Sequence, residues 1–329
     1  MSSLGVPFTD DALEARVHAG IDEIERQLAL AVDSPDAFVA EAAAHLLNAG
    51  GKRFRPLLVM LAAEFGDQAH PDVPRSAVVV ELTHLATLYH DDVMDEASMR
   101  RGAPSANSRW GNSVAILVGD YLFAQASDLV SDLGPECVRI QARTFSRLVQ
   151  GQIRETLGPG EGDDPLAHYL AVVADKTGSL IATAAHLGAK MAGAPADVQE
   201  TLTEFGERIG AAFQLSDDII DIASETGDSG KTPGTDLREG VPTLPTLLAL
   251  RSTDPESERL RALLARPLTD DGELAEAITL LRAHPSMDEA RAYVRAETDT
   301  AQALLAKLPG GAAREALQAL CTTVATRLG

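Results

Sequence analysis

The sequence predicts an all-α protein that folds as one helical domain over residues 1–329. Three observations support this prediction. Aromatic residues make up only 4% of the chain, and Ala and Leu are abundant, a composition that favours helix. Alternating, strand-like runs are scarce. No low-complexity tract or long linker divides the chain, and 329 residues are enough to enclose one large core.

The first half of the chain reads as successive helices. Apolar residues recur on one stripe between Asp10 and Val32, which predicts the first helix. A second helix follows Ser34 and Pro35 and ends near Gly50, because glycine readily caps a helix C-terminus. Four more helices are expected over residues 55–65, 74–95, 112–132 and 136–157.

The second half continues the helical pattern after a polar loop at 158–165. Helices are expected at 166–175 and, past a break at Thr177 and Gly178, at 179–192 and 198–223. The stretch from Glu225 to Pro242 is charged, Gly-rich and poor in apolar residues, so it predicts the longest loop, with a length that suits a lid. Several short helices should follow from Thr243.

Charge and composition exclude some classes of function. The net charge of −21 argues against binding to nucleic acid, which generally needs a basic face, and against attachment to anionic lipid. We expect no stable membrane insertion, because no uninterrupted apolar run reaches about 18 residues. Two cysteines without metal-type spacing and a polar N-terminus without a signal-peptide pattern predict a cytoplasmic protein.

Two copies of the signature D-D-x-x-D are the most informative motif. The first runs from Asp91 to Asp95 and the second from Asp217 to Asp221. Positions i and i+4 share one helix face, so the outer carboxylates of each motif project together and repel each other unless a cation joins them. Oxygen-only ligands suit Mg²⁺, which takes one or two carboxylates and completes its shell with water and phosphate.

A solvated acidic helix face is the alternative interpretation, and one such motif alone could be that. Two motifs in apolar surroundings favour a metal site instead, with the two helices facing each other across one cavity. An EF-hand does not fit, because no loop has its ligand spacing ending in Glu. The sequence also lacks a Walker loop, a dinucleotide fingerprint and a nucleophile elbow.

Basic residues near helix breaks indicate an anionic ligand. Lys52, Lys176 and Lys231 each lie in a Gly- or Thr-flanked break, where lysine and free backbone N–H groups can bind phosphate. Each of them alone could equally be a surface lysine. Arg100 and Arg101 follow the first acidic motif and can reach diphosphate oxygens, although a salt bridge to Asp95 or Glu96 is the alternative.

Two further polar residues share the faces of the acidic motifs. Gln214 lies three residues before Asp217, and His84 lies two turns before Asp91. A lone helix histidine is as often a satisfied core or surface group as a ligand, so both interpretations of His84 stay open.

The motifs together resemble the trans-isoprenyl diphosphate synthases, the polyprenyl synthetase family. The resemblance runs from about Asn48 to Leu250, while the chain ends match only in helical character. One departure is Val241, where many members carry Lys. The matching segments, in family order, are Gly50–Pro56, His84–Asp95, Arg100–Gly102, Val118–Asp120, Gly151–Gln152, Lys176–Thr177, Phe213–Leu215, Asp217–Asp221 and Gly230–Leu237.

The resemblance implies a homodimeric, single-domain helical bundle of the isoprenoid synthase type around a deep central cavity. It implies Mg²⁺ held by Asp91, Asp95, Asp217 and Asp221. The residues implied for the allylic diphosphate are Arg100, Lys176, Thr177, Gln214 and Lys231, of which Lys176, Gln214 and Lys231 are assigned catalytic roles. The residues implied for isopentenyl diphosphate are Lys52, Arg55, His84 and Arg101.

Residues upstream of the first motif bear on product length. The growing tail should run beside the predicted helix below Asp91, and a bulky aromatic four or five positions before the motif would close the cavity early. The small Ala86 and Thr87 leave it open, and the next residues along this wall are Thr83, Val79 and Val80. We therefore expect a medium- or long-chain polyprenyl product, roughly hexaprenyl to decaprenyl. The alternative is that small residues only permit close helix packing.

Other functions stay open as alternatives. A geranylgeranyl or farnesyl diphosphate synthase would share every motif and differ in cavity depth. A class I terpene cyclase would carry an Asn/Ser/Glu-type second metal motif, and a non-catalytic synthase subunit would have lost one acidic motif; the sequence shows neither change. A structural metal-binding protein would not need the basic residues.

Overall fold

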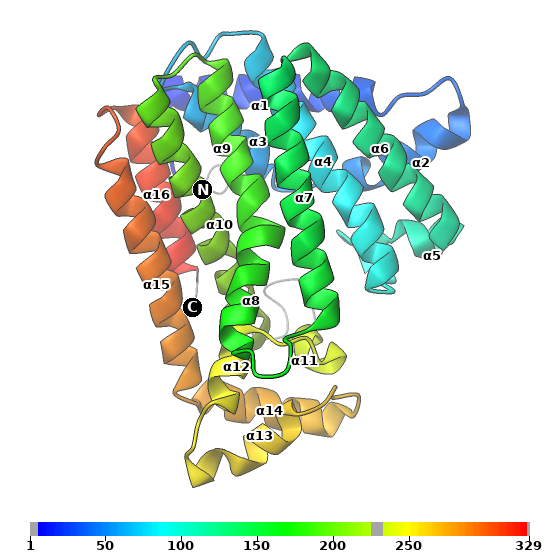
Figure 1. The fold of residues 1–329 in the computed structure, drawn as a ribbon, viewed down its shortest axis with the longest axis vertical. Helices are drawn as coiled ribbons and strands as arrows, with labels where there is room; N and C mark the ends of the chain where they lie inside the picture. Colours follow the sequence, from blue (N-terminus) through cyan, green and yellow to red (C-terminus); the bar gives the residue numbers. More distant parts are fainter. Residues whose placement is uncertain (1–5, 225–232, 328–329) are drawn as a thin grey trace. The chain divides into compact units, whose positions relative to one another are not determined.

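The computed structural model describes residues 6–224 and 233–327, and it confirms the all-α prediction (Figure 1). The described helices are α1 (Asp11–Ala31), α2 (Ala37–Asn48), α3 (Phe54–Ala63), α4 (Asp72–Met94), α5 (Ala106–Trp110), α6 (Asn112–Asp132), α7 (Pro135–Leu157), α8 (Pro165–Val173), α9 (Ser179–Met191), α10 (Ala196–Ala223), α11 (Thr235–Glu239), α12 (Leu244–Leu250), α13 (Glu258–Leu264), α14 (Asp271–Ala283), α15 (Ser286–Leu305) and α16 (Ala312–Thr326), with a 3₁₀ turn at Pro255–Ser257.

Local sequence explains where the first helices begin and end. The side chain of Asp10 caps α1 by accepting a hydrogen bond from the amide of Leu13 at 2.6 Å. The apolar stripe predicted for this helix is buried, from Leu13 to Leu28. Asp36 caps α2 in the same way, and α2 ends at Asn48 just before the two glycines. The expected boundaries are confirmed within a few residues.

Two local features differ from the expected pattern. A short hairpin follows α4, formed by β1 (Met99–Arg100) and β2 (Ala103–Pro104). Its turn residues Arg101 and Gly102 have φ angles of 53° and 77°, the left-handed pair that a tight hairpin requires. The expected break at Thr177 and Gly178 is wrong, because a π-helical turn over Ala174–Gly178 joins α8 to α9 without interruption.

The expected loop from Glu225 to Pro242 also differs in part. Residues 225–232 lie outside the described residues, and α11 occupies Thr235–Glu239. Glycines in the left-handed conformation bound this short helix on both sides, since Gly234 has φ 77° and Gly240 has φ 75°.

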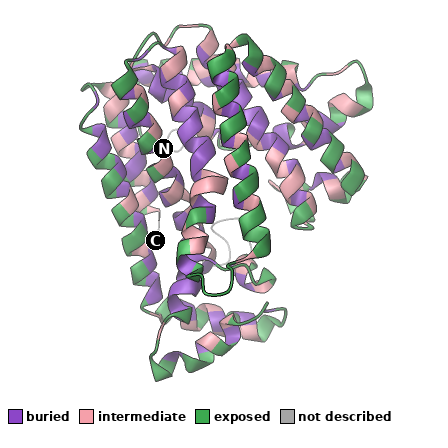
Figure 2. Cartoon of the chain, in the orientation of Figure 1, coloured by how far each residue is buried: buried purple, intermediate pink, exposed green. Residues whose placement is uncertain are grey.

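Contacts between Cα atoms group the chain into two compact units. Unit 1 comprises Met1–Ser146, Leu180–Gly206 and Leu305–Ala319, and unit 2 comprises Arg147–Ser179, Glu207–Leu304 and Leu320–Gly329. The expectation of one domain over residues 1–329 stays a prediction. Within unit 1, α4 packs against α1, α3 and α6, and Figure 2 shows buried residues concentrated along it. Burial on several sides suits the Val- and Leu-rich sequence of α4.

One described helix is long and apolar enough to cross a membrane. This helix is α6, and 33% of its apolar window is buried inside the protein. The sequence expectation rested on uninterrupted apolar runs, whereas α6 carries Asp120 within its span. A core helix meets the same length and composition criteria, so α6 alone is weak support for insertion.

Candidate active site

The first acidic motif forms the C-terminal end of α4 in unit 1. Asp91 is partly buried, and Asp95, the C-cap residue, has 47% of its side chain exposed. Asp92 between them is fully buried and accepts a hydrogen bond from Nε of Arg100 at 2.6 Å. Burial raises the pKa of Asp92 while Arg100 lowers it. The outer carboxylates therefore remain accessible, while the middle one anchors the hairpin.

The hairpin presents both predicted arginines. Arg100 contacts Asp92 and, at 3.9 Å, Asp95, so the salt bridge considered from the sequence is present. Arg101 donates to the backbone carbonyl of Leu46 at 3.0 Å and also to that of Gly50. The hairpin is thereby tied to the end of α2 and to the loop that carries Lys52.

Arg53 holds that loop in shape from its buried position. Its φ of 47° is a left-handed conformation that costs a non-glycine residue free energy, so other contacts must stabilise it. Its guanidinium pairs with Glu25 and with the buried carboxylate of Glu81 on α4 at 3.2 Å. Lys52 just before it is exposed. The sequence interpretation passed over Arg53, although it lies within the matched motif.

The structure brings Arg55, His84, Arg100 and Arg101 together in unit 1. Burial, followed by the positive charges of Arg55, Arg101, Arg100 and Arg53, lowers the pKa of His84 well below its usual value. Nε of Arg55 is buried and has no hydrogen-bond partner among the described residues. A cluster of arginines around a neutral histidine, with one donor unsatisfied, suits an anion such as diphosphate.

The second acidic motif lies near the C-terminal end of α10, in unit 2. Asp217 is half exposed and pairs with Arg327 at the end of the described chain. Asp218 is buried and accepts hydrogen bonds from the Tyr169 hydroxyl and from the Leu244 amide at 3.2 Å. Burial raises the pKa of Asp218 to about 6. Oδ2 of Asp221 accepts a hydrogen bond from the amide of Asp236 in α11 at 3.4 Å.

The π-helical turn of unit 2 carries Lys176 and Thr177. Lys176 pairs with Glu155 of α7 at 2.5 Å. The Thr177 hydroxyl donates to Oε1 of Gln214 at 3.2 Å, and Nε2 of Gln214 donates to Oδ1 of Asp218 at 3.2 Å. A chain of hydrogen bonds therefore links this turn to the second acidic motif, and two of the predicted residues, Thr177 and Gln214, take part in it.

Lys231 lies outside the described residues. Asp92, Asp218 and Tyr169 were not predicted to act. The Asp-Asp doublets were a signal for Asp92 and Asp218. The second aspartate of each doublet points about 100° away from the first around the helix, toward the protein interior. The spacing of the motif could not reveal Tyr169 as a partner of Asp218, because Tyr169 is far away in sequence.

The acidic residues fit a hard divalent cation. Within residues 6–224 and 233–327, no three His, Cys, Asp or Glu side chains gather closely enough to hold a metal ion. Each unit instead offers outer carboxylates at i and i+4, and Asp92 has one oxygen without a hydrogen-bond partner among the described residues. Mg²⁺ needs only one or two carboxylates when phosphate and water fill the other positions.

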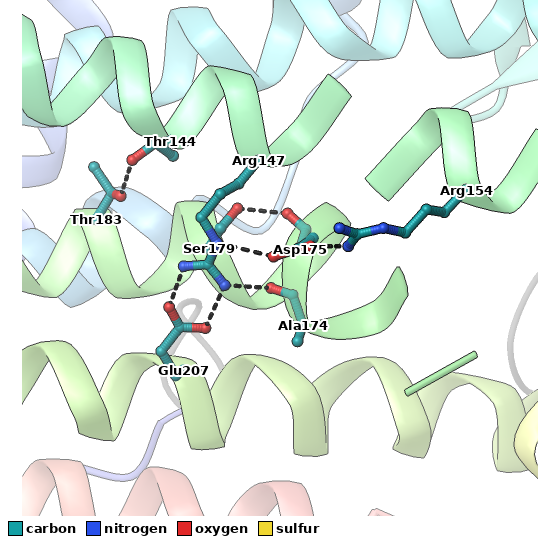
Figure 3. Close-up of polar contacts among 8 residues, drawn as sticks. All are labelled: Thr144, Arg147, Arg154, Ala174, Asp175, Ser179, Thr183 and Glu207. Atoms are coloured by element: carbon teal, nitrogen blue, oxygen red, sulfur yellow. Dashed lines mark hydrogen bonds and ion pairs between the residues drawn. The ribbon is translucent and has the colours of Figure 1, made fainter. Parts of the chain in front are cut away.

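A small pocket in unit 1 lies beside α4 on the side of the predicted tail wall. It has a cavity volume of about 10 Å³ and is lined by Val79, Val80 and Thr83 of α4, together with residues of α7 and α9. Thr144 of α7 and Thr183 of α9 line its far side, where their hydroxyl groups lie 2.6 Å apart (Figure 3). Ala86 is buried and leaves no large side chain on this face.

The chain is similar to known proteins over most of its length. The model of the family described as polyprenyl synthetase matches residues 36–281. The nonaprenyl diphosphate synthase of Mycobacterium tuberculosis is 52% identical, over 99% of this chain and 97% of the relative. A geranylgeranyl pyrophosphate synthase from Corynebacterium glutamicum, solved with calcium and isoprenyl diphosphate, has a TM-score of 0.90 at 48% identity, over 98% of this chain and 100% of that one.

A decaprenyl diphosphate synthase from Rhodobacter capsulatus is similar at lower identity. Its TM-score is 0.88 at 33% identity, covering 97% of this chain and 99% of that chain. These similarities confirm the family resemblance and the all-α fold of the isoprenoid synthase type. The calcium in the Corynebacterium structure indicates that divalent metal is used in this family.

Proposed function

The chain belongs to the polyprenyl synthetase family of prenyltransferases, and on that premise we propose that it condenses isopentenyl diphosphate with an allylic diphosphate. The product is an all-trans polyprenyl diphosphate. The observation that carries the proposal is the coexistence of two acidic motifs with accessible outer carboxylates and a cluster of arginines around a neutral His84. One set suits a cation and the other an anion, as a reaction between two diphosphates requires.

We propose Mg²⁺ as the metal, held by Asp91, Asp95, Asp217 and Asp221. When bound, Mg²⁺ neutralises diphosphate charge and makes the allylic diphosphate a better leaving group. Arg327 pairs with Asp217 and must give up this contact before that carboxylate can bind a cation.

The chain's own residues divide between the two substrates. Lys52, Arg55, His84 and Arg101 hold isopentenyl diphosphate, and His84 can donate a hydrogen bond while neutral. The residues for the allylic diphosphate are Arg100, Lys176, Thr177, Gln214 and Lys231. Lys176 stabilises the negative charge that grows as the C–O bond breaks. The isopentenyl double bond attacks the allylic carbon, and the proton lost afterwards passes to the released diphosphate.

We propose a medium- or long-chain product. The small pocket beside Val79 supports it, since this residue lies about 18 Å up the axis of α4 from Asp91. Ala86, buried and small, leaves the intervening wall without a bulky side chain. The nonaprenyl and decaprenyl synthases among the relatives are compatible with this choice, and the geranylgeranyl synthase represents the shorter alternative.

We also propose that the protein is a cytoplasmic homodimer without stable membrane insertion. Exposed apolar side chains on α6, Ile116 at 44% and Leu117 at 66%, support a partner surface. Cys137 and Cys321 are buried free thiols, which is compatible with a reducing compartment.

Sizing the products tests the proposal. The full-length enzyme, Mg²⁺, geranyl diphosphate and isopentenyl diphosphate should yield chains beyond the twenty-carbon stage. Ala86→Phe should shorten the product because the ring fills the wall of α4, whereas Leu30→Phe, on the exposed face of α1, should not. Products that stop at fifteen or twenty carbons in the wild type would refute the chain-length proposal, and absence of condensation would refute the reaction.

A further inference from the structure

The π-helical turn at Ala174–Gly178 departs from regular helix where two proposed substrate contacts lie. A π turn inserts an extra residue into a helix, is rare, and occurs most often at functional sites. Here it carries Lys176 and Thr177. Because the regular α-helix competes with it, contacts from neighbouring elements must hold the turn in place. In unit 2 these contacts come from α7 and α10.

Arg147 of α7 makes the most extensive of these contacts (Figure 3). Its Nε donates to Oδ1 of Asp175 at 2.9 Å, and Nη2 donates to the carbonyl of Ala174 at 3.3 Å. The other face of the guanidinium binds Glu207 of α10 in a bidentate manner, with Nη2 3.2 Å from Oε2. One side chain thus joins the first two residues of the π turn to a carboxylate on another helix.

The backbone of α7 supports the same turn one helical turn further on. A methyl group added to Gly151 would lie 2.8 Å from the amide nitrogen of Lys176 and 3.2 Å from Cβ of Asp175. The absence of a side chain therefore lets α7 approach the turn closely. Ser179 completes the set, because its hydroxyl donates to the carbonyl of Asp175 at 2.6 Å.

We propose that Arg147 is a positioning residue for the allylic diphosphate. It acts through Asp175 and Ala174 to keep Lys176 and Thr177 at the spacing set by the π turn. This inference rests on the proposed function, in which those two residues bind the allylic substrate. Arg147 does not touch the substrate itself, since its guanidinium donors are directed at Asp175, Ala174 and Glu207.

Arg154 provides a matched control. It comes from the same helix and pairs with the other carboxylate oxygen of Asp175, and its side chain is 44% exposed compared with 40% for Arg147. Among the residues that the structure describes, the Arg154 side chain makes no hydrogen bond or ion pair with α10 and contacts the π turn only through Asp175 (Figure 3). A role in general charge balance would make the two arginines equivalent, whereas a positioning role would not.

The test compares Arg147→Gln, Arg147→Lys and Arg154→Gln in the full-length enzyme. Arg147→Gln should raise the KM for geranyl diphosphate about tenfold, because a small displacement of a substrate contact is costly. The KM of Arg147→Gln for isopentenyl diphosphate should change less than about twofold. In Arg154→Gln, the KM values for both diphosphates should change less than about twofold. Arg147→Lys should have a KM for geranyl diphosphate between those of the wild type and Arg147→Gln. Calorimetric titration of each variant with inorganic pyrophosphate in the presence of Mg²⁺ should rank the pyrophosphate affinities of the variants in the same order.

Several outcomes would overturn the inference. An unchanged KM for geranyl diphosphate in Arg147→Gln would do so, and so would equal effects of Arg147→Gln and Arg154→Gln. If Arg147→Gln does not fold, Glu207→Gln, which keeps the shape of the α10 anchor and removes its charge, should shift the same KM in the same direction. A wild-type enzyme that forms no product refutes the proposed function instead, so the two failures are distinguishable.

Discussion

The two D-D-x-x-D motifs share their letters but differ in their surroundings. The first ends α4, and its middle residue Asp92 is neutralised by a cation, Arg100 of the adjoining hairpin. The second lies near the C-terminal end of α10, and its middle residue Asp218 is held by neutral donors, among them the Tyr169 hydroxyl and the Gln214 amide. In both motifs the middle aspartate is buried and the outer ones are at least partly accessible.

This comparison separates two roles within one motif. The outer aspartates share a helix face and are at least partly exposed, whereas the middle one points into the protein and fixes neighbouring elements. Asp92 fixes the hairpin that carries Arg100, and Asp218 connects α8, α10 and the start of α12. Each motif therefore couples a proposed metal site to a proposed phosphate contact nearby.

The largest expected effect comes from the outer aspartates. Asp91→Asn and Asp217→Asn should each lower kcat about 10²- to 10³-fold, because each removes charge that stabilises the transition state through the cation. Steady-state assays at saturating Mg²⁺ measure the effect. Asp197→Asn, at the exposed start of α10, should leave kcat unchanged. Near-normal turnover in one of the two variants would mean that only one motif serves the reaction.

The middle aspartates should matter for stability. Tyr169→Phe removes a donor to buried Asp218 and should lower the free energy of unfolding by about 1–3 kcal/mol. Tyr121→Phe is the control, because its hydroxyl donates to the carbonyl of Asp33 at an exposed position. Urea denaturation gives both values. Equal losses in the two variants would contradict an anchoring role for Asp218.

The basic cluster near the first motif should give that region a dependence on pH. The pKa of His84 is lowered in the folded protein, so below its unfolded pKa of about 6.5 the unfolded state binds more protons. Stability is therefore complete above that pH and falls on acidification, by at most about 1.4 kcal/mol per pH unit. Urea denaturation at pH 7.5 and 5.5 measures this loss.

His84→Gln should remove the part of the stability loss between pH 7.5 and 5.5 that is due to His84. His18→Gln, a change on the exposed side of α1, should retain this loss. An identical pH dependence in the wild type and His84→Gln would show that His84 is not held neutral by its burial and by the arginines around it.

Part of the candidate site could be predicted because its signals are local. The paired carboxylates of Asp91 and Asp95 follow from helix periodicity. Two features were not predictable in this way. The sequence around Thr177 and Gly178 looked like a helix break, yet Arg147 and Glu207 hold it as a π turn. The role of Arg53 depends on Glu81, from another helix.

The sequence by itself determined the helices and the face on which each outer aspartate lies, since both depend on the repeat of 3.6 residues per turn. Only the tertiary structure decided which charges are buried and what neutralises them. Asp218 meets Tyr169 from α8 and Leu244 from α12, and Arg53 meets Glu25 and Glu81. A buried charge must be paired by whatever segment the fold brings beside it, and the spacing of residues along the chain does not encode that partner.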